Sequence, residues 1–263
     1  MFALGGDSFP DDTQQLHAAL TSGAMLQGAD EGAVSLDGNF PSLDALRMNL
    51  TGVRLDSRTP LAAAGENVGE GFFSRTLDVT AEPALLASIP IRLRLHAEDC
   101  VFAFGRAENG SRVARLERCS GGTLDAEAAT ADLESALLAL ARDAASEHGA
   151  EVQSVRLTLV AESPHKIAVT GITVAKAMFF TATLTIRGQI ELDDIFNMRL
   201  SNATCAGDGM IANLAAAQLR PRLAELEKRV FSPMTFLPSG VRATGVELSG
   251  GDSLRISATM AGG

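Results

Sequence analysis

Long stretches of the chain alternate apolar and polar residues with a period of two. Phe73 to Thr80, Ile91 to His96 and Phe180 to Leu192 follow this pattern. Such alternation is typical of antiparallel strands with one buried and one exposed face. The last run has thirteen residues and would extend for roughly 43 Å at about 3.3 Å per residue. Gly171 and Gly188 interrupt this region and predict bends or bulges.

Three segments have the spacing of helices instead. Asp12 and Thr13 resemble a helix start ahead of Leu16 and Leu20. Two longer helices are predicted over about 124–148 and 208–230, each roughly 33 Å long for about 22 residues. The first of these has an apolar stripe of Leu133, Leu137, Leu140 and Ala144. The second has an apolar side of Ile211, Leu214, Leu219, Leu223, Leu226 and Val230.

The strands and the long helices have comparable predicted lengths, and strands with one apolar face must pack that face against another element. We therefore predict an α+β fold in which long helices are wrapped by a strongly curved, mostly antiparallel β-sheet. Cys119 and Cys205 occupy matching places before the two long helices, which suggests an internal duplication. The predicted organisation is a single domain, 1–263, with two pseudo-repeats of about 1–150 and 151–263.

Composition and charge exclude some classes of function. The formal net charge of −10 argues against nucleic-acid binding, because neutralising phosphates requires a basic face. No uncharged run reaches the length of about eighteen residues that predicts a transmembrane helix. Met1 to Gly6 lacks the features of a signal peptide. The protein is therefore either cytoplasmic or, if an export segment has been removed, periplasmic or part of the cell envelope.

The residues that usually carry chemistry form no recognisable motif. His96 and Glu98 have the His-x-Glu spacing of zinc deaminases, but no Pro-Cys-x-x-Cys follows. An exposed histidine on the polar side of a strand is the favoured interpretation. The acidic pairs Glu98-Asp99 and Asp193-Asp194 favour solvated turns over an acid–base site, because neighbouring carboxylates on a turn usually point apart. The sequence thus predicts no enzyme, no metal site and no cofactor.

Three cysteines, Cys100, Cys119 and Cys205, form neither a disulfide framework nor a metal motif. Free cysteine often behaves as a small core residue, so buried free thiols are favoured. A disulfide between Cys119 and Cys205 is the alternative.

Part of the chain is similar to a known family. A helix from Ile211 to Leu226 leads into Leu237-Pro238-Ser239-Gly240-Val241, and two strands follow at 246–248 and 252–256. This order of glycine, proline and apolar positions resembles the bacterial LmeA-like branch of the TULIP (tubular lipid-binding) superfamily. The resemblance implies binding or transfer of a lipid without covalent chemistry, and it allows transient contact with a membrane.

The expected function is therefore non-enzymatic binding of a lipid or another hydrophobic ligand in a slot between the helices and the curved sheet. Each buried methylene would contribute about 0.8 kcal/mol before the costs of association. The residues expected to line this slot are Leu133, Leu137, Leu140, Phe180, Leu184, Phe196, Met198, Ile211 and Leu214.

Two aromatic doublets support an alternative from another class. In a strand, only one member of Phe72-Phe73 or of Phe179-Phe180 can face a core. The other member is exposed, or it contacts a ligand or a partner. A structural or assembly module that acts through protein–protein contacts is the alternative function, and the oligomeric state is left open.

Overall fold

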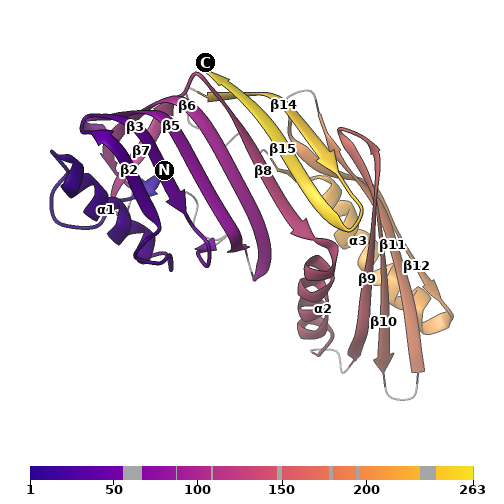
Figure 1. The fold of residues 1–263 in the computed structure, drawn as a ribbon. Helices are drawn as coiled ribbons and strands as arrows, with labels where there is room; N and C mark the ends of the chain where they lie inside the picture. The colour runs from indigo at the N-terminus through magenta and orange to yellow at the C-terminus, as the bar shows by residue number, and fades with distance from the viewer. Residues whose placement is uncertain are drawn as a thin grey trace. The chain divides into compact units, whose positions relative to one another are not determined.

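The computed structural model describes residues 1–55, 67–86, 88–107, 109–146, 150–177, 180–193, 196–231 and 241–262. The chain divides into two compact units (Figure 1). Unit 1 comprises Met1–Glu127, Met234–Gly245 and Ser257–Gly263, and unit 2 comprises Ala128–Pro233 and Val246–Ile256. No helix among the described residues is both long enough and apolar enough to span a bilayer.

Unit 1 contains one helix and a large sheet with the strand order β14-β15-β8-β6-β5-β3-β2. Neighbouring strands are antiparallel along β2-β3 and β5-β6-β8, whereas β3 and β4 pair with β5 in parallel. The strands of this sheet are β1 (Phe2–Ala3), β2 (Val34–Asn39), β3 (Ser42–Asn49), β4 (Arg54–Leu55), β5 (Asn67–Leu86), β6 (Ile89–Arg106), β7 (Arg112–Arg118), β8 (Gly121–Ala129), β14 (Val241–Ser249) and β15 (Ser253–Gly262). Residues 128–129 of β8, 246–249 of β14 and 253–256 of β15 belong to unit 2.

Helix α1 (Thr13–Met25) begins where the sequence predicts. Asp12 is its N-cap, and its carboxylate accepts a hydrogen bond of 2.7 Å from the Gln15 N–H. This bond satisfies one of the amide groups that a helix start leaves without a partner. Leu16 and Leu20 lie one turn apart and are fully buried. The helix therefore covers the core of unit 1 with the side that the sequence pattern indicates.

Aromatic residues of β5 and β6 form the centre of this core. Phe72 and Phe102 pair across the two strands, and their rings stack at 4.5 Å. Phe72 is 3% exposed, whereas Phe73 is only half-buried on the other face. This confirms that one member of the doublet faces the core. Phe179 lies outside the described residues, as does the side chain of Phe180.

All three cysteines are buried free thiols, as favoured by the sequence, and Cys119 is not bonded to Cys205. Burial raises the pKa of the Cys100 thiol to about 12, and the nearby Cys119 and Asp99 add to the increase. Because the reactive form of cysteine is the thiolate, these side chains act as packing residues.

Unit 2 is built on a second, five-stranded antiparallel sheet with the order β13-β12-β11-β10-β9. Its strands are β9 (Glu151–Ser163), β10 (Lys166–Ala177), β11 (Phe180–Leu192), β12 (Met198–Asp208) and β13 (Val230–Phe231). The bounds of β11 match the predicted run. A register shift between Arg187 and Gln189 confirms a bulge at Gly188. No bulge occurs at Gly171, because β10 pairs regularly with both neighbours there.

The predicted arrangement of long helices inside a curved sheet is wrong. Of the described residues, 60% lie in strands and 21% in helices, and neither sheet is curled around a helix. The two later helices, α2 (Thr130–Ser146) and α3 (Met210–Glu227), have 17 and 18 residues. The residues before α2 belong to strand β8, because their backbone pairs with β6 from Gly121 to Glu127. Tertiary pairing overrides the helical propensity of this alanine- and acid-rich segment.

Helix α2 packs on β9 and α3 packs on β12 (Figure 1), and their side chains close these outer edges of the unit 2 sheet. On β9, Glu134 accepts the Leu157 N–H at 2.7 Å, and Arg142 donates to the Val152 carbonyl at 3.0 Å. On β12, Glu227 accepts the Ala203 N–H at 2.6 Å. Arg220 donates to the carbonyl of Cys205 at 3.3 Å. These bonds occupy backbone groups that an uncovered edge strand would offer to another chain.

Candidate functional site

The strands of unit 2 carry their apolar residues on one face of the sheet. Directly paired residues of antiparallel strands share a face, so the pairings identify its members. Leu157, Gly171, Ile186 and Cys205 form one row across β9, β10, β11 and β12. The next row toward the β10–β11 turn contains Val155, Thr173, Leu184 and Gly207, and the preceding row contains Leu159, Val169 and Gly188.

This apolar face is covered at its sides and at one end. Helix α2 packs on β9, and α3 packs on β12 and the adjoining part of β11. The turn between β14 and β15 brings Gly250 against Leu159 and Ile167, which are 5% and 0% exposed. Cys205 is buried where α3 crosses β12. The middle of the face is therefore covered neither by the two helices nor by the turn.

The middle of the face is only half-covered. Leu157, Val169, Leu184 and Ile186 are all half-buried. A Cβ atom added to Gly171, in the row between Leu157 and Ile186, would meet no heavy atom within 4 Å. We call these five residues the open apolar face. An uncovered apolar surface of this kind is characteristic of binding sites.

The apolar stripe predicted for α2 does not pack on the sheet. Glu134 bonds to β9, and the half-buried Leu138, Ala141 and Ala145 follow it at helical spacing, shifted from the predicted stripe by one position or about 100° around the helix. Leu133 is half-buried, and Leu137 and Leu140 are 42% and 66% exposed. The stripe therefore lies beside the contact with the sheet, where a ligand can reach it.

The apolar side predicted for α3 is partly correct. Leu219 and Leu223 are half-buried and lie within about 20° of Ala212 around the helix, on the side that packs on β12. The closest contact is made by small residues, because Ala212 and Ala216 are 1% and 0% exposed. Leu214 lies about 160° around the helix from both and is 65% exposed, so it points away from the sheet. Leu226 and Val230 are exposed as well.

The remaining predicted ligand-binding residues are spread along β11 and β12. Leu184 pairs with Gly207, whereas Met198 pairs with Leu192. Eight residues of β11, roughly 26 Å of strand, separate these two positions. Phe196 lies in the turn beside Met198, where its ring contacts His165 at 6.5 Å. The predicted set thus does not converge on one slot, and the side chains of Phe180 and Ile211 lie outside the described residues.

Sequence reasoning missed Leu157, Val169, Gly171 and Ile186 as members of the open apolar face. The alternation of β9 and β10 already indicated which of their residues share a face. The pairing register, which brings Gly171 between Leu157 and Ile186, comes only from the structure.

Unit 1 contains a hollow with different chemistry. A cleft of about 330 Å³ lies between the N-terminal loop and the first turns of α1. Its lining is made of small residues and one glutamine and consists of Gly5, Gly6, Asp7, Ser8, Pro10, Gln15, Ala18, Ala19 and Ser22. No leucine, isoleucine or phenylalanine lines it, in contrast to the strands of unit 2.

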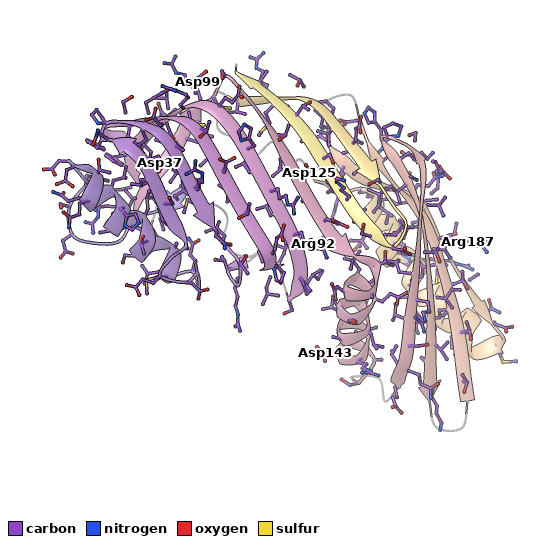
Figure 2. All side chains as sticks on the ribbon, viewed as in Figure 1. Asp37, Arg92, Asp99, Asp125, Asp143 and Arg187 are labelled. Carbon is purple, nitrogen blue, oxygen red and sulfur yellow. The ribbon has the colours of Figure 1, made fainter. Side chains whose placement is uncertain are left out.

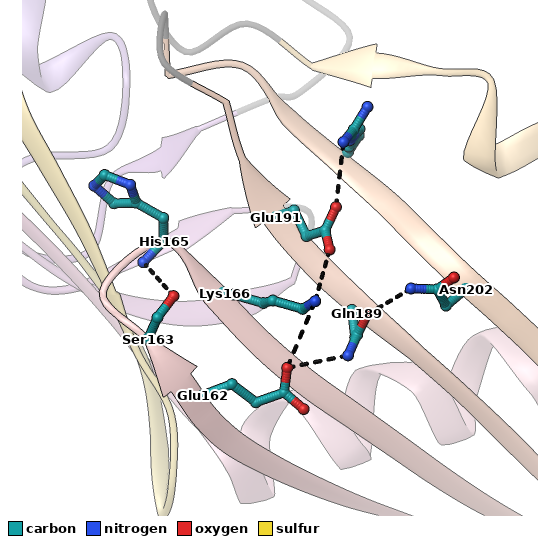
Figure 3. A network of polar contacts seen from close by, with 8 residues as sticks. Glu162, Ser163, His165, Lys166, Gln189, Glu191 and Asn202 are labelled. Atoms are coloured by element: carbon teal, nitrogen blue, oxygen red, sulfur yellow. Dashed lines mark hydrogen bonds and ion pairs between the residues drawn. The ribbon is translucent and has the colours of Figure 1, made fainter.

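The opposite face of the unit 2 sheet carries a polar network (Figure 3) in addition to the exposed Val160 and Ile172. Lys166 on β10 contacts Glu191 on β11 at 3.0 Å and Glu162 on β9 at 3.8 Å. Gln189 donates to Glu162 at 3.0 Å and accepts from Asn202 on β12 at 2.7 Å. Four strands are joined in one register by these contacts, so this network holds the sheet that carries the open apolar face.

Unit 1 also has a charged face, to which Arg92 and Asp125 of Figure 2 belong. There the Nδ1 of His96 donates to Asp78 at 2.7 Å, and the Nε2 lies 3.8 Å from Glu98. The hydrogen bond to Asp78 raises the pKa of His96 above its usual value, and the charges of Asp78 and Glu98 add to this increase against partial desolvation. His96 is therefore the exposed histidine that the sequence favours.

The raised pKa of His96 predicts a pH-dependent stability. The stabilisation is complete below the unfolded-state pKa near 6.5 and is lost as the pH rises through the higher folded-state pKa. We expect the free energy of unfolding of wild type to exceed that of His96→Asn by a few tenths of a kcal/mol at pH 5.5, since the pair is half-exposed. At pH 8.5 the two free energies should be equal. Thermal unfolding across this range measures the difference. An Asp78→Asn variant should lose the same dependence, and an unchanged pH profile in both variants would contradict the assignment.

No three histidine, cysteine or acidic side chains gather as metal ligands within the described part of the chain. Of the acidic pairs, Asp99 accepts a hydrogen bond from Ser120 at 3.0 Å, and Asp194 lies outside the described residues. Comparisons with protein-family models, curated proteins and solved structures return no match to this chain. The open apolar face therefore stands as the candidate site on its own geometry.

Proposed function

We propose that the protein binds a lipid or another hydrophobic molecule, without covalent chemistry, against the open apolar face and the neighbouring stripe of α2. The observation that carries the proposal is the position of Gly171. Half-buried leucine and isoleucine side chains flank it in one row, and the space above it is empty. Because glycine has no side chain, this row has a gap between Leu157 and Ile186.

The physical basis of binding is burial of apolar surface. Leu137 and Leu140 on α2 remain in water while Leu157, Leu184 and Ile186 on the strands are half-covered. A ligand that covered them would gain about 25 cal/mol for each Å² of apolar surface removed from water. No charged group belongs to the open apolar face, so the binding should depend weakly on salt.

Filling the space above Gly171 tests this proposal. Gly171→Leu introduces a side chain into empty space at a φ angle that L-residues adopt freely, so the fold should be retained. We expect its affinity for a fluorescent fatty acid, dansyl-undecanoic acid, to fall at least about tenfold, because the leucine occupies the ligand's volume. Fluorescence titration of the full chain measures the dissociation constant.

The matched control adds the same bulk to the other face of the same strand. Thr170 neighbours Gly171 and pairs with Arg187 on the polar side of the sheet, so Thr170→Leu should bind the probe as wild type does. If neither wild type nor the control binds the probe, or if Gly171→Leu binds equally well, the proposal fails. A defined oligomer that only Leu137→Glu and Leu140→Glu disrupt would instead support the assembly module.

A further inference from the structure

Helix α3 is apolar on two opposite sides. One side packs on β12 through Ala212 and Ala216. The other side points to solvent, and at about 100° per residue it comprises Met210, Leu214, Ala217, Pro221 and Ala224. We call these five residues the outer stripe. All of them are exposed, with Met210 at 89% and Leu214 at 65%. A helix that is apolar on both sides is normally covered on both.

The charges around the outer stripe differ in sign from those of the whole protein. Arg220, Arg222, Lys228 and Arg229 are exposed in the second half of α3 and just beyond it, against Glu225 and Glu227. Four basic and two acidic groups give a local charge of +2 on a chain whose net charge is −10. Glu227 and Arg220 are both turned to the backbone of β12, where they bond to Ala203 and Cys205. The remaining charges are Arg222, Lys228 and Arg229 against Glu225, which is again +2. The apolar stripe is thus set in the basic part of an acidic molecule.

The basic side chains lie on both sides of the outer stripe. Taking the stripe's centre as reference, Arg220 and Arg222 lie roughly 90° and 110° around the helix in opposite directions. Arg222, Lys228 and Arg229 form no ion pair with any other described residue. Long basic side chains in this position can reach lipid phosphates while the apolar residues between them enter the acyl region.

We propose that the outer stripe of α3 is a docking surface for a lipid bilayer that contains anionic headgroups. Anionic headgroups complement the local charge of +2, whereas two copies that met stripe to stripe would bring like charges together. The helix would lie in the plane of the interface, with its Ala212 and Ala216 side still packed on β12.

Co-sedimentation of the full chain with vesicles tests this proposal. One vesicle is phosphatidylcholine alone, and the other contains about 30% phosphatidylglycerol, which supplies the anionic surface. We expect binding to the anionic vesicle and at least about tenfold weaker binding to the neutral one. Raising NaCl from about 0.1 M to about 0.5 M should weaken it, because salt screens the headgroup charge.

Variants assign the binding to the outer stripe. Met210→Glu with Leu214→Glu should lower vesicle binding at least about tenfold, since both carboxylates would enter the interface. Arg222→Gln with Lys228→Gln should remove most of the preference for anionic lipid. The control is Leu26→Glu, an 80% exposed leucine at the end of α1, which should bind as wild type does.

The result that would overturn the proposal is equal binding of wild type and the Met210→Glu, Leu214→Glu variant, or no binding to either vesicle. A wild-type dimer that this variant dissociates in light scattering would also overturn it. The docking surface does not depend on the proposed ligand site. The outer-stripe variant should bind dansyl-undecanoic acid normally, and Gly171→Leu should bind vesicles normally, so the failure of either proposal is recognised separately.

Discussion

Replacing Phe102 with alanine is expected to lower the free energy of unfolding by about 3–5 kcal/mol. The side chain is 2% exposed and is the largest among the fully buried residues. Its ring stacks on Phe72 at 4.5 Å and contacts Phe2 at 6.0 Å. Truncation removes these contacts and leaves a cavity that paired strands cannot close, because hydrogen bonds to both neighbours hold the β6 backbone.

Urea unfolding followed by circular dichroism measures this loss. The control is Phe73→Ala, because Phe73 has the same side chain on the neighbouring position of β5 but is only half-buried on the other face. Its loss should be smaller by about half, in proportion to the surface that it buries. A Phe102→Ala variant as stable as Phe73→Ala would show that the aromatic cluster is not the centre of unit 1.

Replacing Gly207 with alanine is expected to destabilise unit 2 by about 3 kcal/mol, at the upper end of overpacking effects. A Cβ atom at this position would lie 2.1 Å from the carbonyl carbon and 2.2 Å from the carbonyl oxygen of Ala212. Both are backbone atoms of α3, so no side-chain rotation can relieve the clash. The helix must move away from β12, and the contacts of Ala212 and Ala216 are lost with it.

The control for this variant lies on the same face of the same sheet. Gly171→Ala adds an identical methyl group where nothing lies within 4 Å, so stability should change by less than about 0.5 kcal/mol. Thermal unfolding compares the two, and hydrogen exchange of the α3 amides reports whether the helix has been displaced. Equal melting temperatures for Gly207→Ala and wild type would contradict the close approach of α3.

The elements that sequence patterns predicted best are those whose signal is local. The alternation from Phe180 to Leu192 gave the bounds of β11, and the Asp12-Thr13 pair gave the start of α1. In both cases the deciding interactions lie within a few residues: the strand's own pleat and a side chain that accepts an amide three positions on. The strand signals were correct, yet they could not show that the sheets stay uncurled.

The errors arise where contacts distant in sequence decide. Gly171 and Gly188 are equivalent by pattern, but only Gly188 lies beside a register shift. The contact face of α3 follows its small residues, because Gly207 admits the helix so closely that Ala212 and Ala216 fit where leucines would not. Of the candidate site, Leu184 and the α2 stripe were predictable from periodicity, whereas the empty space above Gly171 depends on the positions of both helices.

The closed edges of the unit 2 sheet have a consequence for folding during synthesis. Helix α2 precedes β9 in the chain, so Glu134 and Arg142 exist before the strand that they cover. Helix α3 follows β12, and Arg220 and Glu227 leave the ribosome only after that strand is complete. Until then β12 is a nascent edge that can recruit a neighbouring polypeptide. The interval between Asp208 and Glu227 is thus the window in which the growing chain is most exposed to misassembly.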